Sequence, residues 1–223
     1  MTKHYQKEID KLKKQLLHLT ASVEERVQAA VSSVTEGDVK LAREVIEGDH
    51  EIDLMEVELE EELLKILALH QPVAIDLRFI VAALKINSDL ERIGDLAVNI
   101  AERASQLRDF NVRSAPFRLE EMLGLVVAMV KGSTDALINM DADLARTICD
   151  TDDQVDEVHR EAYRNTLVRI VDTPDQADYY ISLVSISRNL ERIADHATNI
   201  AEDVIYMVEG EIVRHQGGML NGQ

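Results

Sequence analysis

The stretch that decides the fold runs from Leu90 to Glu102 and reads LERIGDLAVNIAE. One hundred positions later, residues 190–202 read LERIADHATNIAE, which is identical at ten of thirteen places. Two copies of one long segment within a single chain indicate an internal duplication, so we expect a molecule of two similar halves.

Apolar residues on both sides of each copy recur every three or four positions. From Phe79 to Leu107, and again from Tyr179 to Met207, this spacing continues without a break. It is typical of a long helix that buries one face against other helices. Packing accounts for the apolar positions, but it gives no reason to repeat polar residues that lie outside that seam. Those polar residues are Glu91, Asp95 and Asn99 in the first copy and Glu191, Asp195 and Asn199 in the second.

The composition favours helices and excludes several classes of partner. Apolar residues make up 46% of the 223 residues, aromatic residues only 4%, and there are three prolines. The formal charge of −18, from 24 basic and 42 acidic residues, would repel nucleic-acid phosphates and anionic lipids. We therefore expect no nucleic acid among the partners, whereas cations or basic protein surfaces fit this charge.

Cysteine content and apolar runs indicate the compartment. Cys149 is the single cysteine, so the chain has no internal disulfide framework. Residues 1–15 alternate charges, unlike a signal peptide, and the longest uncharged apolar run, 123–130, is far shorter than the ~20 residues that span a bilayer. We expect a cytoplasmic protein with no direct membrane insertion.

The fold class that these patterns predict is all-α: two tandem three-helix bundles, with six long antiparallel helices, related by internal duplication. Gly37 suits a left-handed helix end, Asp38 suits the cap of the next helix, and Pro72 and Pro174 interrupt the pattern in equivalent places. The predicted helices cover about residues 4–34, 38–69 and 73–107, then a fourth from Pro116 to a break at Asp141, a fifth, and a sixth after Pro174. The predicted domains are residues 1–110 and 116–215, followed by a disordered tail at 216–223.

Two acid pairs precede the repeated blocks, each with a spacing of four residues. Asp49 and Asp53 lie on the second predicted helix, and Asp152 and Asp156 on the fifth. Residues four apart share a helix face, where like charges repel and a cation would relieve the cost. Because residues equidistant from a hairpin turn lie at equal height, each pair should be level with the acids of the following block.

Four carboxylates per half at one height supply the oxygen ligands that Mg, Mn or Fe prefers, and Zn is a further candidate. Asn99 and Asn199 could add amide oxygens. One step is open: Asp95 points directly away from its own seam, so level matching alone does not bring it to the second helix. His159 occupies the place of Glu56 and could extend the second cluster, whereas His196 replaces Leu96 and is expected to lie on the surface.

The repeated block, together with QPVAIDLR at residues 71–78, resembles the PhoU family over about residues 5–215. That resemblance implies a cytoplasmic, often dimeric regulator that represses the phosphate regulon when phosphate is plentiful. The implied partners are a sensor histidine kinase and the ATPase subunit of a phosphate ABC transporter. The family is also described with metal ions, including multinuclear iron clusters. Carried onto this chain, the ligands are Asp49, Asp53, Glu91, Asp95 and Asn99, then Asp152, Asp156, Glu191, Asp195 and Asn199. The second half departs from the pattern with Ala194 and His196.

Three functions remain as alternatives. We favour a non-enzymatic, metal-binding adaptor that acts through protein contacts. A carboxylate-bridged di-metal oxidoreductase would need inward-facing acids and two Glu-x-x-His motifs, but only Glu47 to His50 matches. The third alternative is a metal-free helical scaffold.

Overall fold

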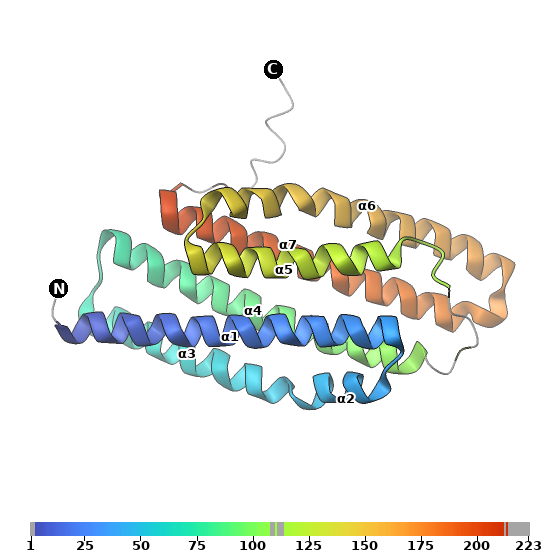
Figure 1. Cartoon of the computed structure of the whole chain (residues 1–223), viewed down its shortest axis with the longest axis horizontal. Coiled ribbons are helices and arrows are strands. Elements are labelled where there is room, and N and C mark those ends of the chain that lie inside the picture. The colour runs from blue at the N-terminus through green and yellow to red at the C-terminus, as the bar shows by residue number, and fades with distance from the viewer. Residues whose placement is uncertain (1–2, 108–109, 111–113, 212, 214–223) are drawn as a thin grey trace, which may run out of the picture.

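A computed structural model describes residues 3–107, 110, 114–211 and 213 of the chain (Figure 1). These residues form seven α-helices and one short 3-10 helix, and they contain no strand. The predicted tail at 216–223 lies outside the described residues. The helices are α1 (Lys3–Glu36), α2 (Val39–Glu47), α3 (Asp49–His70), α4 (Ala74–Leu107), α5 (Leu119–Asn139), α6 (Ala142–Asp172), η1 (Pro174–Gln176) and α7 (Ala177–Glu209).

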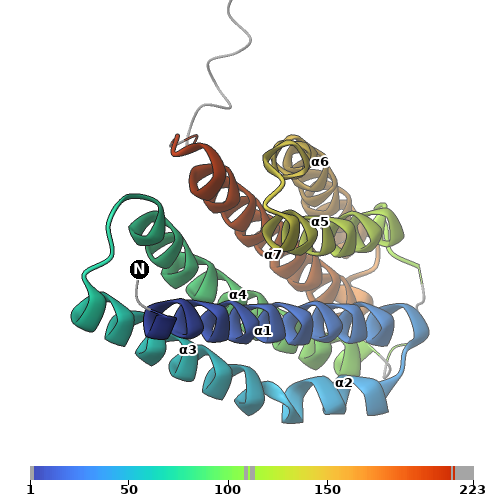
Figure 2. The same cartoon turned by 60° about the vertical axis from the view of Figure 1, so that its left-hand side comes forward.

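The predicted all-α bundle is confirmed. Helices α1 to α4 form one group and α5 to α7 the other, and the groups meet where α4 packs against α7 and α1 against α5. In both views α3 lies on the outer flank of the first group and α6 on the outer flank of the second (Figures 1 and 2). The two helices that carry the repeated block therefore form the centre of the molecule.

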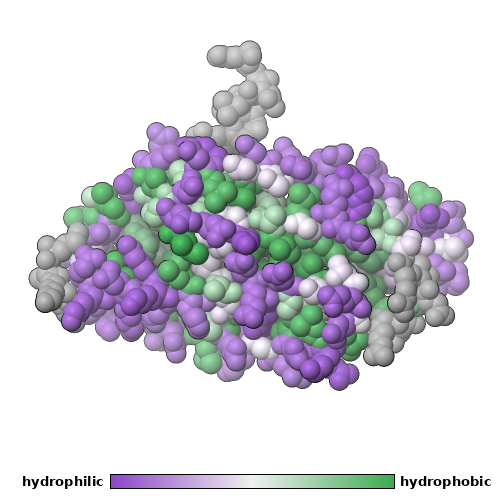
Figure 3. Space-filling model, in the orientation of Figure 1, coloured by the Kyte–Doolittle hydropathy of each residue, from purple (hydrophilic) through white to green (hydrophobic). Residues whose placement is uncertain are grey.

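The predicted seams form the core. In α4, Ala83, Ile86, Leu90 and Ile93 are fully buried, and the equivalent residues of α7 are buried to the same degree. The α1 seam is buried as well, from Ile9 to Ala30. Hydrophilic side chains cover most of the edges of the face shown in Figure 3, with smaller apolar areas between them. Within the described residues, no helix combines the length and apolarity needed to cross a bilayer.

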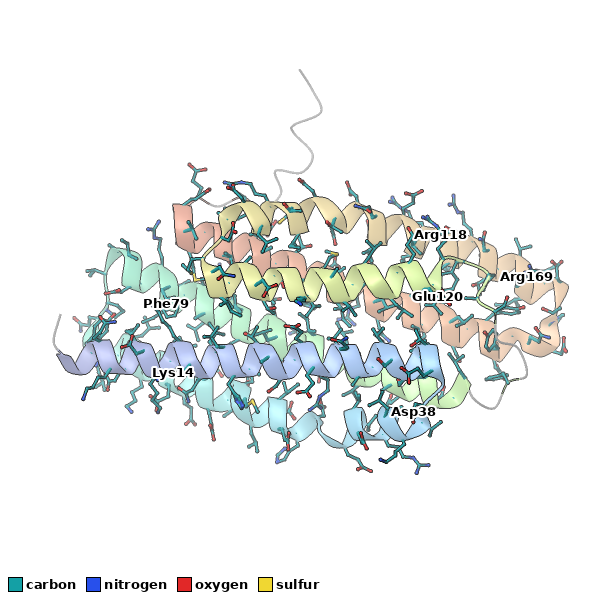
Figure 4. The ribbon with its side chains drawn as sticks, in the orientation of Figure 1. Lys14, Asp38, Phe79, Arg118, Glu120 and Arg169 are labelled. Atoms are coloured by element: carbon teal, nitrogen blue, oxygen red, sulfur yellow. The ribbon has the colours of Figure 1, made fainter. Side chains whose placement is uncertain are left out.

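Both halves begin their second helix in the same way. Gly37 has φ +66°, and the Asp38 carboxylate accepts hydrogen bonds from the backbone N–H groups of Lys40 and Leu41 (Asp38 is labelled in Figure 4). One hundred and three positions later, Met140 has φ +52° and Asp141 accepts two equivalent bonds. The predicted turn and cap at residues 37 and 38 are therefore confirmed.

The prediction of one continuous helix over residues 38–69 was wrong, because α2 and α3 are separate helices that meet at Gly48. Arg26 of α1 reaches into this break: Nη1 donates to the Val45 carbonyl at 3.0 Å and Nη2 donates to the Gly48 carbonyl at 2.7 Å. The Gly48 carbonyl also accepts the backbone N–H of Glu51 at 3.1 Å, so the guanidinium adds hydrogen bonds at the break beside the remaining backbone ones. Helix α6, the counterpart of α2 and α3, is unbroken.

Candidate metal centres

The level matching predicted for each helical hairpin is confirmed by hydrogen bonds. In the first half, Asn87 Nδ2 of α4 donates to the Glu56 carbonyl of α3 at 3.0 Å. In the second half, His159 Nδ1 of α6 lies 3.0 Å from Ser187 Oγ of α7. Both contacts join residues that are almost equidistant from the turn, and both lie one to two helical turns from the acids.

Close packing beside the acids sets the spacing between α3 and α4. A Cβ atom added at Gly94 would lie 3.3 Å from two side-chain carbons of Ile52, so these helices are in close contact and an added methyl group would need Ile52 to shift by a few tenths of an ångström. Gly94 directly precedes Asp95, and Ile52 directly precedes Asp53. The approach of the two backbones therefore brings the carboxylates that follow them to one place.

The first cluster consists of Asp49, Asp53 and Asp95. One carboxylate oxygen from each lies within 4.8 Å of the others. The open question about Asp95 is thereby answered: although it points away from its own seam, it meets the acids of α3. Burial, Asp53 and Asp95 together raise the pKa of Asp49 above its ordinary value. Glu91 is close enough to interact with these acids, because burial and Asp95 raise the pKa of its carboxyl group.

Arg26 is a member of the first cluster that the sequence analysis missed. Its Nη1 atom lies 3.9 Å from Asp49 Oδ1, and its side chain is only 10% exposed. This cation partly offsets the repulsion among the acids and lowers the pKa of Asp49. The available signals were a glycine inside a predicted helix and an arginine where the second half has Met129.

The second cluster consists of Asp152, Asp156, Glu191 and Asp195. Burial, then Asp195 and Asp156, raise the pKa of Asp152 to about 6, while the nearby Thr198 hydroxyl partly offsets the rise. The pKa values of Glu191 and Asp195 are also raised, first by burial and then by the neighbouring acids of the cluster. Among the described residues, only the first cluster brings three such oxygens within 4.8 Å. The carboxylate oxygens of the second cluster are therefore spaced farther apart, although they still repel one another.

The two asparagines have different surroundings. Asn99 is exposed on α4, whereas Asn199 Nδ2 donates to Asp89 Oδ1 at 3.4 Å. His196 does not lie free on the surface as expected, because its Nδ1 atom is 2.7 Å from the same Asp89 oxygen and its side chain is only 15% exposed. Asp89 belongs to the first half, so His196 and Asn199 help to join the two halves.

Neither Cys149 nor a hollow near the C-terminal ends of α1 and α4 belongs to the acid clusters. Burial and nearby acids raise the pKa of the Cys149 thiol to about 11, so it stays protonated and unreactive at neutral pH. A hollow of about 760 Å³ lies where α1, α4, α5 and α7 meet, lined by residues such as Leu107, Phe117 and Tyr179. None of the predicted metal ligands lines it.

The donor set of both clusters fits a hard or borderline cation. Each supplies carboxylate oxygens from two helices held at one height. Burial is the largest cause of the raised pKa values of Asp49 and Asp152, and repulsion by the neighbouring carboxylates adds to it. His159 approaches the second cluster, where burial lowers its pKa and Asp156 raises it, so an imidazole lies beside this cluster.

Comparisons with known proteins agree with this architecture. Residues 6–104 and 119–204 both match the family model described as "PhoU domain". The chain is 38% identical over 97% of its length to a PhoU homologue of Pseudomonas putida, covering 85% of that protein. It is 40% identical over 94% of its length to a homologue from Aquifex aeolicus, covering 95% of that protein. Both are named phosphate-specific transport system accessory proteins.

Two solved structures share the fold. The crystal structure of PhoU from Pseudomonas aeruginosa superposes with a TM-score of 0.89 at 37% identity, covering 93% of this chain and all of that one. The phosphate transport system regulatory protein PhoU from Streptococcus pneumoniae gives a TM-score of 0.82 at 29% identity, covering 94% of this chain and 99% of that one.

Proposed function

Because the chain belongs to the PhoU family, we propose that it is an accessory protein of phosphate transport with a regulatory role. The observation that carries this proposal is that both halves match one family model. The relatives that share this match are named as accessory proteins of phosphate transport. The match covers nearly the whole chain, so the role proposed belongs to both halves together.

The finer proposal is a negative regulator of phosphate-regulon signalling that works in the cytoplasm through protein contacts. Its partners would be the sensor histidine kinase of the regulon and the ATPase subunit of the phosphate ABC transporter, and a homodimer is the proposed assembly. A long helical molecule with two exposed flanks supports this mode of action, since its surface offers several faces for protein contacts.

We further propose that each acid cluster binds a metal ion. In the first half the ligands would be Asp49, Asp53, Glu91 and Asp95, with Asn99 at the edge. In the second half they would be Asp152, Asp156, Glu191 and Asp195, with Asn199 close by. A bound cation supplies positive charge that offsets repulsion among the carboxylates. The chain's own contribution is to hold acids from two neighbouring helices at the same distance from the hairpin turn.

A catalytic role is the weaker alternative. Glu47 ends α2 and His50 lies in α3, so the break at Gly48 separates the two residues of the single Glu-x-x-His motif. The acids also face the flank of the bundle rather than its core, where di-metal oxidases hold their ions. This geometry favours an ion that stabilises the fold or a docking surface.

Deletion of the gene tests the regulatory role. In phosphate-rich medium, a phosphate-starvation reporter should become active in the deletion strain, and plasmid-borne wild-type protein should silence it again. A reporter that stays silent after deletion would contradict the proposal.

Elemental analysis tests metal binding separately. Protein purified without chelator or affinity tag should contain metal, and an Asp95→Ala/Asp195→Ala double variant should lose most of it. The matched control, Glu58→Ala/Glu120→Ala, removes two exposed acids outside the clusters and should keep its metal. Equal metal content in all three proteins would end the ligand hypothesis.

A further inference from the structure

The outer face of α6 carries an apolar and basic stripe that the described residues of the chain leave exposed. We call it the α6 outer stripe. Its residues recur at intervals of three and four, which is the spacing of a buried helix face, yet all six are exposed. The exposed fractions of its apolar side chains run from 50% to 79%. The stripe consists of Arg160, Tyr163, Arg164, Leu167, Val168 and Val171.

The core does not require this stripe, since α6 buries the opposite side of the helix. Val155, Val158, Ala162 and Thr166 form that buried side, at the same spacing. Helix α6 therefore has two faces with the pattern of a packing surface, and the described part of the chain packs against only one of them. A contiguous exposed apolar area of this kind is typical of an interaction site.

The duplication provides an internal control for this stripe. Residues 159–171 contain three arginines and one glutamate, whereas the equivalent residues 56–68 contain five glutamates and one lysine. The segment in α6 is thus locally positive within a chain of charge −18. A charge inversion confined to one of two duplicated faces points to a requirement of that face rather than of the shared fold.

The arginines of this segment are available to a partner. Within the part of the chain that the structure describes, no carboxylate lies within ion-pair distance of Arg160, Arg164 or Arg169, although Arg160 Nε donates to the Asp156 carbonyl at 3.2 Å. Arg118, by contrast, contacts the carboxylates of Glu121, Glu157 and Glu161. Figure 4 labels both Arg118 and Arg169, the latter near the C-terminal end of α6.

We propose that the α6 outer stripe docks a partner protein through an amphipathic segment whose apolar face is edged by carboxylates. This inference rests on the proposed function, which requires a partner, and adds the surface and its chemistry. Tyrosine and arginine are the side chains that most often dominate binding at protein interfaces, and both occur in the stripe. From Arg160 to Val171 the stripe is about 17 Å long, enough for roughly three turns of a docked helix.

Charge and geometry disfavour the two other occupants. A flat anionic membrane would also approach the exposed acids beside the stripe, such as Glu157 and Asp172, whereas one docked helix need not. A second copy could offer its acidic α3 face, but α3 and α6 lie on opposite flanks. Such a contact is head-to-tail and would add copies without closing.

The test uses two charge reversals of equal size. Arg160→Glu/Arg164→Glu changes the stripe, and Arg43→Glu/Arg103→Glu is the matched control at exposed positions elsewhere. In the deletion strain, the control should restore silence of the starvation reporter and the stripe variant should not, with equal protein levels and thermal unfolding. If the deletion activates the reporter and the stripe variant still silences it, the stripe proposal is overturned while the proposed function stands.

A binding measurement decides the proposal even if the deletion leaves the reporter silent. The probe is a synthetic amphipathic helix with leucines on one face flanked by glutamates. It should slow hydrogen exchange at residues 160–171, and Arg160→Glu/Arg164→Glu should weaken its binding roughly 10- to 100-fold, because like charges then face each other. No protection at these residues overturns the proposal. So does stripe-dependent binding to anionic vesicles, or self-association that only the stripe variant loses.

Discussion

Two helical hairpins carry the acids: α3 with α4, and α6 with α7. Their carboxylates occupy equivalent positions, but the residues packed beside those carboxylates differ. In the first hairpin Gly94 packs closely against Ile52, whereas the equivalent residues of the second hairpin are Ala194 and Val155. The second pair gains a methyl group on one helix and loses one on the other. The two substitutions therefore nearly cancel in side-chain volume.

The hairpins differ more in how they balance negative charge. The first has Arg26 beside Asp49, whereas the equivalent of Arg26 in the second half is the buried Met129. No cation is among the groups that shift the pKa of Asp152, so burial and neighbouring acids raise it to about 6, although Arg192 lowers the pKa of the neighbouring Asp195. The comparison teaches that the second cluster depends more strongly on protons or on an added cation.

The substitution with the largest expected effect is Arg26→Met, which copies the second half into the first. It removes the guanidinium bonds to the carbonyls of Val45 and Gly48 and also the cation beside Asp49, so we expect a loss of about 3 kcal/mol in the free energy of unfolding. Urea unfolding measures this loss. Arg43→Met, at an exposed arginine of α2, is the control and should change stability little. A similar small change for both variants would mean that Arg26 does not support the break.

The next largest effect is expected for Gly94→Val. The added side chain would press on Ile52 and force α3 away from α4, at a cost of about 2 kcal/mol. Combining it with Ile52→Ala should recover part of the loss, because the shortened side chain makes room. The same measurement on Gly124→Val is the control, since nothing lies within 4 Å of a Cβ atom added there. Equal losses at both glycines would refute the proposed close contact.

The smallest effect, and one of opposite sign, is expected for Asp152→Asn in metal-free protein. The folded pKa of about 6 exceeds the unfolded value of about 3.9, so the folded state gains stability on protonation and loses it as the pH rises between these values. Removing the charge should stabilise the protein by about 1.5 kcal/mol at pH 7, with solvent screening allowed for, and by almost nothing at pH 3.5.

The comparison with Asp49→Asn sharpens this prediction. Because Arg26 already lowers the pKa of Asp49, the gain at pH 7 should be smaller there. Urea titrations of chelator-treated proteins at several pH values measure both gains. A larger gain for Asp49→Asn would reverse the interpretation of the two clusters.

Periodicity predicted most of the fold because the apolar seams are long and duplicated. Level matching also predicted which acids share a height, since hairpin geometry follows from the turn position alone. The break at Gly48 could not be predicted in the same way. A glycine within a helix costs only about 1 kcal/mol, so whether the helix ends there depends on a distant side chain, Arg26.

Two side-chain positions escaped the sequence analysis for a related reason. The heptad assignment placed Asp95 directly opposite its seam, but in a hairpin the neighbouring helix also contacts the side of α4, which a single-helix pattern does not describe. His196 was expected at the surface because its equivalent in the first half is Leu96. Its partner, Asp89, lies on a helix of the other half, and no spacing within one repeat indicates such a contact.

The polar contacts between α4 and α7 are not symmetric, although the two helices are copies of one repeat. Asp89 meets His196 and Asn199, and Lys85 Nζ lies 3.2 Å from Asp203 Oδ1. Exchanging each residue for its equivalent in the other repeat would pair Asn189 with Leu96 and Ser185 with Arg103. These residues cannot form the same ion pairs. An ancestral single repeat would have had to pair with an identical twin, whereas here the polar groups distinguish one repeat from the other. Each repeat thus has a charge pattern of its own, with Arg26 buried beside Asp49 in the first and a basic outer face in the second.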